Sequence, residues 1–253
     1  MRIPRRLRYG EEATLVEHLD ELRNRLIVSL LALTVTTAVA FVFHHRIVHW
    51  LEGPLPEDRR QLITFGVAEP FLTSFKISLI VGLGVALPIL LWQLWSFLAP
   101  ALEEGSQRIV VVFVLFATVL LVAGVAFGYY VVLPKALHFL THYDDSLYNI
   151  QIRARDYFSF TLLVLAGVGL VFELPIFVLA LVRIGVLSTR TLRRNRRLGY
   201  FIVAVVAVLL PGIDPFTTTL EMIPLVVLYE GSIWLAVLME RRWGLQEVAA
   251  EPL

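Results

Sequence analysis

Acidic residues just before the first apolar run are the first candidates for binding chemistry in this sequence. Asp20 and Glu21 lie in the segment HLDELRNRL, together with Arg23 and Arg25. Side chains of this kind form ion pairs with charged groups of a partner or with one another. A Glu21–Arg25 pair, four residues apart on one helix face, is worth only about 0.2–0.5 kcal/mol. Taken alone, the segment favours this second interpretation, a solvated charged helix face.

A second candidate, Glu173, stands in the middle of the apolar stretch GLVFELPIF. A carboxylate at the centre of a membrane helix costs roughly 2.5–3.5 kcal/mol even on a permissive scale, and such acids usually mark binding or transport sites. Pro175 follows two residues later and removes a backbone donor, which kinks a helix. The alternative is a structural carboxylate that faces the helix bundle. We favour the functional interpretation.

A third polar region lies near the end of the chain. Its acidic members are Asp214, Glu221 and Glu230, and Thr218 lies between them. Hydration near the outer membrane surface explains Glu221 equally well. Gln93, inside ILLWQLWSF, has a similar alternative, an inter-helix hydrogen bond worth about 0.6 kcal/mol on average.

Signatures of enzymes and cofactor sites are missing from the sequence. It has no cysteine and no GxxxxGK[ST], HExxH or GxSxG motif, which are typical of thiol chemistry, nucleotide hydrolysis, zinc peptidases and serine hydrolases. We therefore predict no enzyme activity, no cofactor and no metal site. A formal net charge of +1 also offers no reason to expect a nucleic-acid partner.

The elements that must position these residues are apolar helices. Hydrophobic residues make up 58% of the 253 positions and charged residues 17%, and about 20 mainly apolar residues suffice to cross a bilayer as a helix. Proline at positions 88, 175 and 224 predicts kinks. The sequence predicts an all-α polytopic membrane protein, a kinked bundle of six transmembrane helices. The predicted spans are residues 26–45, 77–102, 109–134, 157–182, 198–213 and 215–239.

Orientation follows from the basic residues, which favour cytoplasmic loops. With six spans, about two thirds of the 22 Lys and Arg residues share the side of both termini, so both termini are predicted to be cytoplasmic. We expect one integral membrane domain over 1–253, with a cytoplasmic amphipathic segment at 1–25 and a cytoplasmic tail at 240–253. The two outward loops, 46–76 and 135–156, are long for plain connections and are predicted to be structured.

Six stretches together resemble the TatC family, the C subunit of the Sec-independent twin-arginine protein translocase. In chain order they are HLDELRNRL, PFLTSFK, LWQLWSFLAPAL, FGYYVVLPKAL, YFSFTLLVLAGVGLVFELPIFVL and LLPGIDPFTTTLEMIPLVVLYE. No single stretch is convincing, but all six in the right order on a six-span topology are specific. The resemblance covers nearly the whole chain.

The resemblance implies a function that spacing alone does not. Members of this family receive folded proteins whose signal peptides carry paired arginines, and they work with single-span partners, TatA and TatB or a combined TatA-type subunit. It also implies a homo-oligomeric complex in the lipid of the cell inner membrane. A guanidinium pair is best recognised by carboxylates, which agrees with acids at the cytoplasmic rim.

The family's functional residues transfer to individual positions. Glu21 and Arg23 match the N-terminal motif, and Glu173 matches the intramembrane acid. The remaining matches are Phe97 and Pro100 in SFLAP, Asp214 in the loop between spans five and six, and Pro54 in the first outward loop. We expect Glu21 to contact the signal arginines and Glu173 to contact a partner helix.

The chain departs from the family at three positions. Ser106 stands where a glutamate is usual after SFLAPAL, and Glu103 or Glu104 could replace that acid. Asp20 adds a carboxylate that the family often lacks. Thr218 stands where glutamine is common. The signal-binding set expected from the sequence is therefore Asp20, Glu21, Arg23, Phe97, Pro100, Glu103 and Glu104.

Two other functions compete with the translocase. A proton-coupled transporter could use Glu173, Glu221 and Glu230 as a relay, but such transporters are usually built from repeats, and none is visible here. It also leaves the acidic segment around Glu21 without a purpose. An intramembrane enzyme would need a nucleophile paired with a base, and the sequence offers none.

Overall fold

The computed structural model describes residues 15–98, 106–143, 147, 150–210 and 215–243. These residues are almost entirely helical and contain no β-strand apart from one isolated bridge. The predicted all-α class is confirmed. The chain folds into two compact units. The first comprises the described residues up to Glu52 together with Thr64–Val119, and the second comprises Gly53–Ile63 and the described residues from Leu120 onward.

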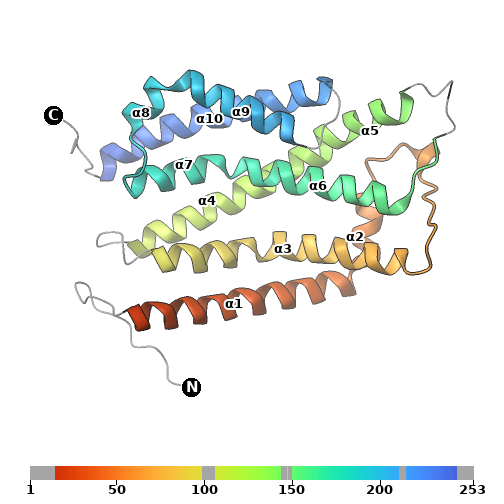
Figure 1. Ribbon diagram of the computed structural model, residues 1–253, viewed down its shortest axis with the longest axis horizontal. Coiled ribbons are helices and arrows are strands. Elements are labelled where there is room, and N and C mark those ends of the chain that lie inside the picture. The colour runs from red at the N-terminus through yellow and green to blue at the C-terminus, as the bar shows by residue number, and fades with distance from the viewer. Residues whose placement is uncertain (1–14, 99–105, 144–146, 148–149, 211–214, 244–253) are drawn as a thin grey trace. The chain divides into compact units, whose positions relative to one another are not determined.

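The first unit is built on two long helices that lie side by side, α1 and α3 (Figure 1). Helix α1 continues without a break from the predicted cytoplasmic segment into the first span. A short α2 follows, and the first half of α4 completes the unit. The bounds are α1 (Leu15–Val42), α2 (His44–Leu51), α3 (Glu69–Leu98) and α4 (Ser106–Phe127).

A glycine allows α1 and α3 to approach closely. A Cβ atom placed on Gly82 would lie 2.7 Å from the backbone nitrogen and Cα of Thr37. The Thr36 hydroxyl donates a 2.8 Å hydrogen bond to the Gly82 carbonyl. Helices in lipid associate through such small residues and interhelical hydrogen bonds, because apolar burial there offers no gain over contact with lipid tails.

The second unit contains the remaining helices. After the 3-10 turn η1 (Glu57–Arg59) and the end of α4, the chain forms the π-helical turn η3 (Gly128–Val132) and α5 (Leu133–His142). Helix α10 packs against both α7 and α9. The later elements are α6 (Ala154–Phe172), α7 (Leu174–Arg183), α8 (Thr189–Arg194), α9 (Arg196–Leu209) and α10 (Pro215–Trp243).

Prolines mark the two interruptions of long apolar helices in this unit. Between α6 and α7 the helix breaks at Glu173, and Pro175 occupies the first turn of α7. Proline has no backbone N–H and clashes with the preceding turn, which ends α6. The π-helical turn η3 lies directly before Pro134 in the first turn of α5. Helix α10 accommodates Pro224 within one continuous element.

The two long loops that the sequence predicts to face outward pair with each other. Ile63 and Arg153 form a parallel bridge, in which the Ile63 N–H donates to Ile152 at 3.0 Å and the Ala154 N–H donates to Ile63 at 2.9 Å. Arg59 Nη1 adds a 3.1 Å bond to the Ile150 carbonyl. These bonds hold the described parts of the two loops together.

Five helical segments of the described residues are long and apolar enough to cross a membrane. They are Leu19–Val42, Glu69–Phe97, Val110–His142, Ala154–Arg183 and Thr217–Glu240. The predicted fifth span corresponds to α9, whose 14 residues extend only about 21 Å, short of a hydrocarbon core of roughly 30 Å. The multi-span class is confirmed, and the count of six stays a prediction.

Candidate functional site

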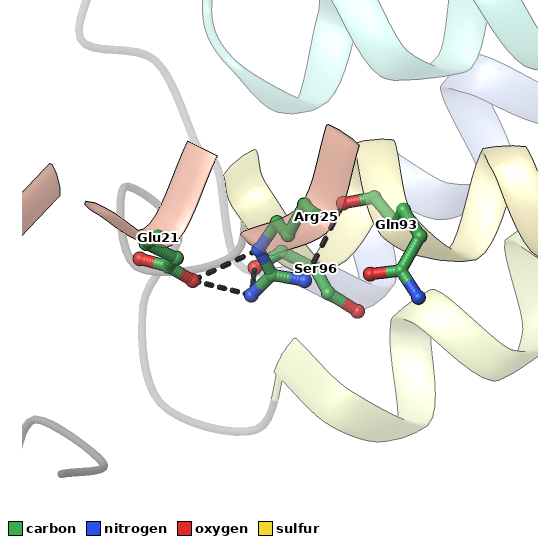
Figure 2. Close-up of polar contacts among 4 residues, drawn as sticks. All are labelled: Glu21, Arg25, Gln93 and Ser96. Atoms are coloured by element: carbon green, nitrogen blue, oxygen red, sulfur yellow. Dashed lines mark hydrogen bonds and ion pairs between the residues drawn. The ribbon is translucent and has the colours of Figure 1, made fainter. Parts of the chain in front are cut away.

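Glu21 in the first unit is held by an arginine one helical turn away (Figure 2). Arg25 Nε donates a 2.9 Å bond to Glu21 Oε1, and Arg25 Nη2 donates to the same oxygen. Both side chains are only partly exposed, 27% for Glu21 and 23% for Arg25. The pair foreseen from the four-residue spacing is therefore present.

Arg25 also reaches from α1 to the end of α3. Its Nη2 donates a 3.0 Å bond to the Ser96 carbonyl, and its Nη1 donates a 3.4 Å bond to the Gln93 carbonyl. The last four carbonyls of a helix, here including that of Ser96, lack intrahelical partners, and the C-terminal end of a helix favours a nearby cation. One guanidinium thus connects the acidic segment to the end of the second predicted span.

This arrangement gathers part of the predicted signal-binding set. Phe97, half-buried, follows Ser96 directly on α3, while Asp20 and Arg23 are exposed on α1 beside Glu21. Gln93 contributes its backbone carbonyl. Pro100, Glu103 and Glu104 lie outside the described residues. The sequence did not indicate that Arg25 links the two helices, because its spacing to Glu21 predicts the ion pair but not the contact with α3.

Glu173 occupies the break between α6 and α7 and is buried, with 3% of its surface exposed. Neither carboxylate oxygen has a hydrogen-bond partner among the described residues. Its backbone N–H donates to the Leu170 carbonyl at 3.1 Å, so the main chain is satisfied and the side chain is not. A buried polar group without a partner costs about 1–3 kcal/mol, and a hydrogen bond from another molecule would remove that cost.

The acids of α10 have separate environments. Glu221 is buried, with 1% exposure. Glu230 accepts a hydrogen bond from the Tyr200 hydroxyl and lies 3.4 Å from the guanidinium of Arg196. Nine residues of helix place these two acids about 14 Å apart on opposite faces. A direct proton relay between Glu221 and Glu230 is therefore not supported.

For the other predicted polar positions, the structure gives the burial and the place in the fold. Thr218 is half-buried on α10, and Pro54 is half-buried between α2 and η1. Asp214 lies outside the described residues. Among the described residues, no group of three metal-ligating side chains is close enough to hold an ion. Arg196 and Tyr200 were not foreseen, since nothing local in the sequence relates them to Glu230.

Comparison with known proteins identifies the family. The model of the family described as Sec-independent protein translocase protein (TatC) matches residues 17–224, most of the chain. This chain belongs to the TatC family. It is therefore a membrane component of the Sec-independent twin-arginine translocase, and the family is one of translocase components rather than enzymes.

Curated relatives agree over nearly their full length. The chain is 34% identical over 240 residues to the TatCd protein of Bacillus subtilis, covering 95% of this chain and 98% of the relative. It is 36% identical over 235 residues to the TatC protein of Aquifex aeolicus, covering 90% and 96%. Both relatives are named Sec-independent protein translocase proteins.

Solved structures agree as well. A crystal structure of a twin-arginine translocase receptor TatC in DDM superposes with a TM-score of 0.75 at 34% identity, covering 87% of this chain and 99% of that chain. A second TatC receptor structure has a TM-score of 0.72 at 35% identity. The TatC resemblance of the six sequence stretches is confirmed.

Proposed function

We propose that this TatC-family chain is the core receptor subunit of a twin-arginine translocation system. It binds the twin-arginine signal peptides of folded proteins and organises single-span partner subunits in a homo-oligomeric complex. The observation that carries this proposal is the position of Glu21, a half-exposed carboxylate linked through Arg25 to the end of α3.

The Glu21 carboxylate retains capacity for a second cation. Both bonds from Arg25 end on Oε1, and Oε2 accepts no hydrogen bond from the described residues. A carboxylate has about four lone-pair positions, so an incoming guanidinium can bind Oε2 while Arg25 stays in place. Because Arg25 also contacts the carbonyls at the end of α3, it holds Glu21 in one orientation before the peptide arrives.

A pair of arginines calls for more than one acid. Asp20 is exposed next to Glu21, and Glu103 or Glu104 follow α3 in the sequence. Together they supply carboxylates for two guanidinium groups, which pair with carboxylates in bidentate geometry. Phe97, near the end of α3, supplies apolar surface for the hydrophobic part of the signal peptide.

A cross-linking experiment tests the role of Glu21. A photo-reactive residue replaces Leu22, which is 45% exposed beside it, and cross-linking to a twin-arginine signal peptide is measured in membranes. We expect Glu21→Gln to reduce the yield at least about tenfold, as loss of one charged bond worth about 1.5–3 kcal/mol implies.

The control for this experiment is Glu57→Gln, which neutralises an acid in the first outward loop. Its side chain is 88% exposed and paired with Arg60, so the yield should not change. An undiminished yield with Glu21→Gln would show that the signal peptide binds elsewhere.

Glu173 is proposed to contact a partner helix by a buried hydrogen bond. Its carboxylate is buried and lacks a partner in the described chain, and a polar residue on a single-span subunit would satisfy it. We expect Glu173→Ala to lower export of twin-arginine substrates and cross-linking to the partner. Glu173→Gln should retain much of both, because an amide still forms the bond. Normal export by Glu173→Ala would refute this contact.

The proposed location is the cell inner membrane, with six spans and both termini in the cytoplasm. Two properties support it, the distribution of Lys and Arg and the position of α9 against α10. Because the chain has no cysteine, a single cysteine introduced at Arg23 or at Glu57 is a unique label. A membrane-impermeant maleimide applied to intact cells should label the cysteine at Glu57 and spare the one at Arg23. The reverse labelling pattern would mean that the N-terminal segment lies outside the cytoplasm, and it would contradict the signal-binding proposal.

A further inference from the structure

The connection between α7 and α9 is strongly basic. Residues 190–197, here called the basic segment, read RTLRRNRR and contain five arginines and no acid. The segment includes most of α8 and the first turn of α9. The function proposed above leaves this concentration of charge unexplained.

Two contacts fix the basic segment along the last four turns of α10. At one end, the Thr189 hydroxyl donates to Glu240, and at the other, Arg196 lies 3.4 Å from Glu230. Ten residues of helix separate those two glutamates, about 15 Å along α10. Figure 1 shows α8 beside the same part of α10. The segment is therefore held at a defined level rather than projecting as a free loop.

Most of this charge is not neutralised within the described chain. Arg190, Arg193, Arg194 and Arg197 are exposed, and none has an ion-pair partner among the described residues. The two glutamates of α10 at this level are already engaged, Glu230 by Tyr200 and Arg196 and Glu240 by Thr189. Four cations are thus available to an external anion.

The same level of the molecule carries exposed apolar side chains. Trp234 on α10 is 66% exposed and Leu238 is 53% exposed, between the two contacts that fix the segment. Leu198 and Phe201 on α9, next to the arginines, are 57% and 65% exposed. Trp234 lies six residues, about 9 Å, before Glu240, where the candidate span ends, and tryptophan near the end of a membrane helix is typical of the interface between headgroups and acyl chains. A headgroup level close to Glu240 would include the arginines that α10 holds there.

We propose that the basic segment binds the phosphate groups of anionic phospholipids. Clusters of four to eight basic residues next to a membrane helix attract anionic lipid surfaces, and guanidinium groups bind phosphate oxygens in bidentate geometry. The length of α9 supports this ligand. A helix of about 21 Å is shorter than the hydrocarbon core, so long cationic side chains at its end reach to the headgroups and reduce the mismatch.

An acidic segment of another protein is the competing ligand. The exposed apolar side chains favour lipid as the ligand. Leu198, Phe201 and Trp234 add, beside the charged surface, an apolar surface that is suited to acyl chains. A soluble acidic peptide would leave that apolar surface in contact with water. This inference does not depend on the signal-peptide proposal, since it concerns different residues in a different unit.

Native mass spectrometry of the purified full chain tests the inference. The protein is mixed with equal amounts of phosphatidylglycerol and phosphatidylcholine, and the bound lipids are counted. The variant Arg193→Gln/Arg194→Gln/Arg197→Gln removes three of the four available charges and leaves Arg196 in place. Each basic residue near an anionic surface changes binding about fivefold, so the preference for phosphatidylglycerol should fall by at least about tenfold.

Two further variants serve as controls. Arg46→Gln/Lys135→Gln/Arg155→Gln removes the same net charge from positions outside the basic segment and should keep the preference. The triple lysine variant Arg193→Lys/Arg194→Lys/Arg197→Lys should keep most of it. Equal circular dichroism melting curves check that all three variants fold.

Three results would overturn the inference. The first is an unchanged preference for phosphatidylglycerol in the glutamine variant of the basic segment. The second is an equal loss in the control set, which would mean that only net charge matters. The third is displacement of the lipid by inorganic phosphate or by a poly-glutamate peptide, which would indicate a soluble anion or an acidic protein segment as the ligand.

Discussion

The least and the most buried of the candidate membrane spans lie in different units of the molecule. Only 6% of the most apolar window of Leu19–Val42 in the first unit is buried, against 61% for Ala154–Arg183 in the second. The first helix is therefore stabilised mainly by lipid and by its contact with α3, whereas α6 and α7 form part of a protein core. A helix with so little protein contact depends strongly on the few contacts that it has.

Each unit also joins two helices through an arginine, but the acceptors differ. In the first unit, Arg25 binds backbone carbonyls of α3, which every residue type supplies. In the second unit, Arg196 pairs with Glu230, an acceptor that depends on one particular side chain. The first connection should tolerate changes in α3, and the second should fail when Glu230 is replaced.

The largest loss of stability is expected where α1 and α3 of the first unit approach each other closely. In Gly82→Val, the new Cβ would lie 2.7 Å from backbone atoms of Thr37. Unlike a side chain, these backbone atoms cannot move away by changing a rotamer. We expect a loss of about 1–3 kcal/mol, the usual cost of overpacking, measured as thermal stability in detergent. Cross-linking between cysteines introduced on α1 and α3 should also fall.

Gly84→Val is the matched control on the same helix. A Cβ atom placed on Gly84 would meet no neighbouring atom within 4 Å, so the stability of this variant should stay close to that of the parent. Equal losses at both positions would mean that the β-branched residue, and not the contact with α1, is responsible.

A smaller effect is expected at the corresponding glycine of the second unit. A Cβ atom on Gly199 would overlap the ring of Tyr229, which is 7% exposed. Gly199→Ala should cost roughly 1–2 kcal/mol, less than Gly82→Val, because a side chain can move. Tyr229→Leu in the same chain should recover part of that loss in a double-mutant cycle. Strictly additive losses would show that the ring is not the obstacle.

Removal of the Arg25 connection is expected to have a moderate effect. Arg25→Ala leaves Glu21 and the Ser96 carbonyl without their partner. The free energy of unfolding should fall by about 1 kcal/mol, at the lower end of the usual cost of a lost hydrogen-bond partner, because the site is half-exposed. Arg23→Ala, an exposed neighbour on α1, should leave thermal stability unchanged. If both variants melted alike, the contact with α3 would contribute nothing.

The smallest effect is expected for Arg196→Gln. Its pair with Glu230 is partly exposed, 41% and 24% for the two side chains, and such pairs contribute at most about 1 kcal/mol. The loss should shrink at high salt, because ions screen exposed charges. Arg190→Gln, which has no acid to lose in the described chain, is the control. A loss for Arg196→Gln that does not depend on salt would contradict an ionic origin.

Most of the fold could be predicted because the spanning helices are long and uniformly apolar. The predicted range 77–102 corresponds to a helix described over Glu69–Leu98, and the range 157–182 to the pair α6 and α7. The break at Glu173 was also predictable, since Pro175 interrupts hydrogen bonding locally. The predicted range 198–213 runs past the end of α9 at Leu209, although Pro211 already marks that end in the sequence, because a proline disfavours helix in the residue before it.

The candidate site was only partly predictable. The spacing of Glu21 and Arg25 indicates their pair, because residues four apart on a helix are neighbours. No local pattern indicates that Arg25 reaches Ser96, or that Tyr200 and Arg196 meet Glu230. These contacts join residues 71, 30 and 34 positions apart in the chain, and they exist only after the helices have packed.

By itself, the sequence predicted which segments enter the membrane, since transfer into lipid depends on the composition of each segment alone. It also determined the family, through six stretches in a fixed order. The tertiary structure alone decided which charges are neutralised and which remain available. Neutralisation depends on distances between helices, so Arg25 and Arg196 acquired partners while Arg193, Arg194 and Arg197 stayed exposed.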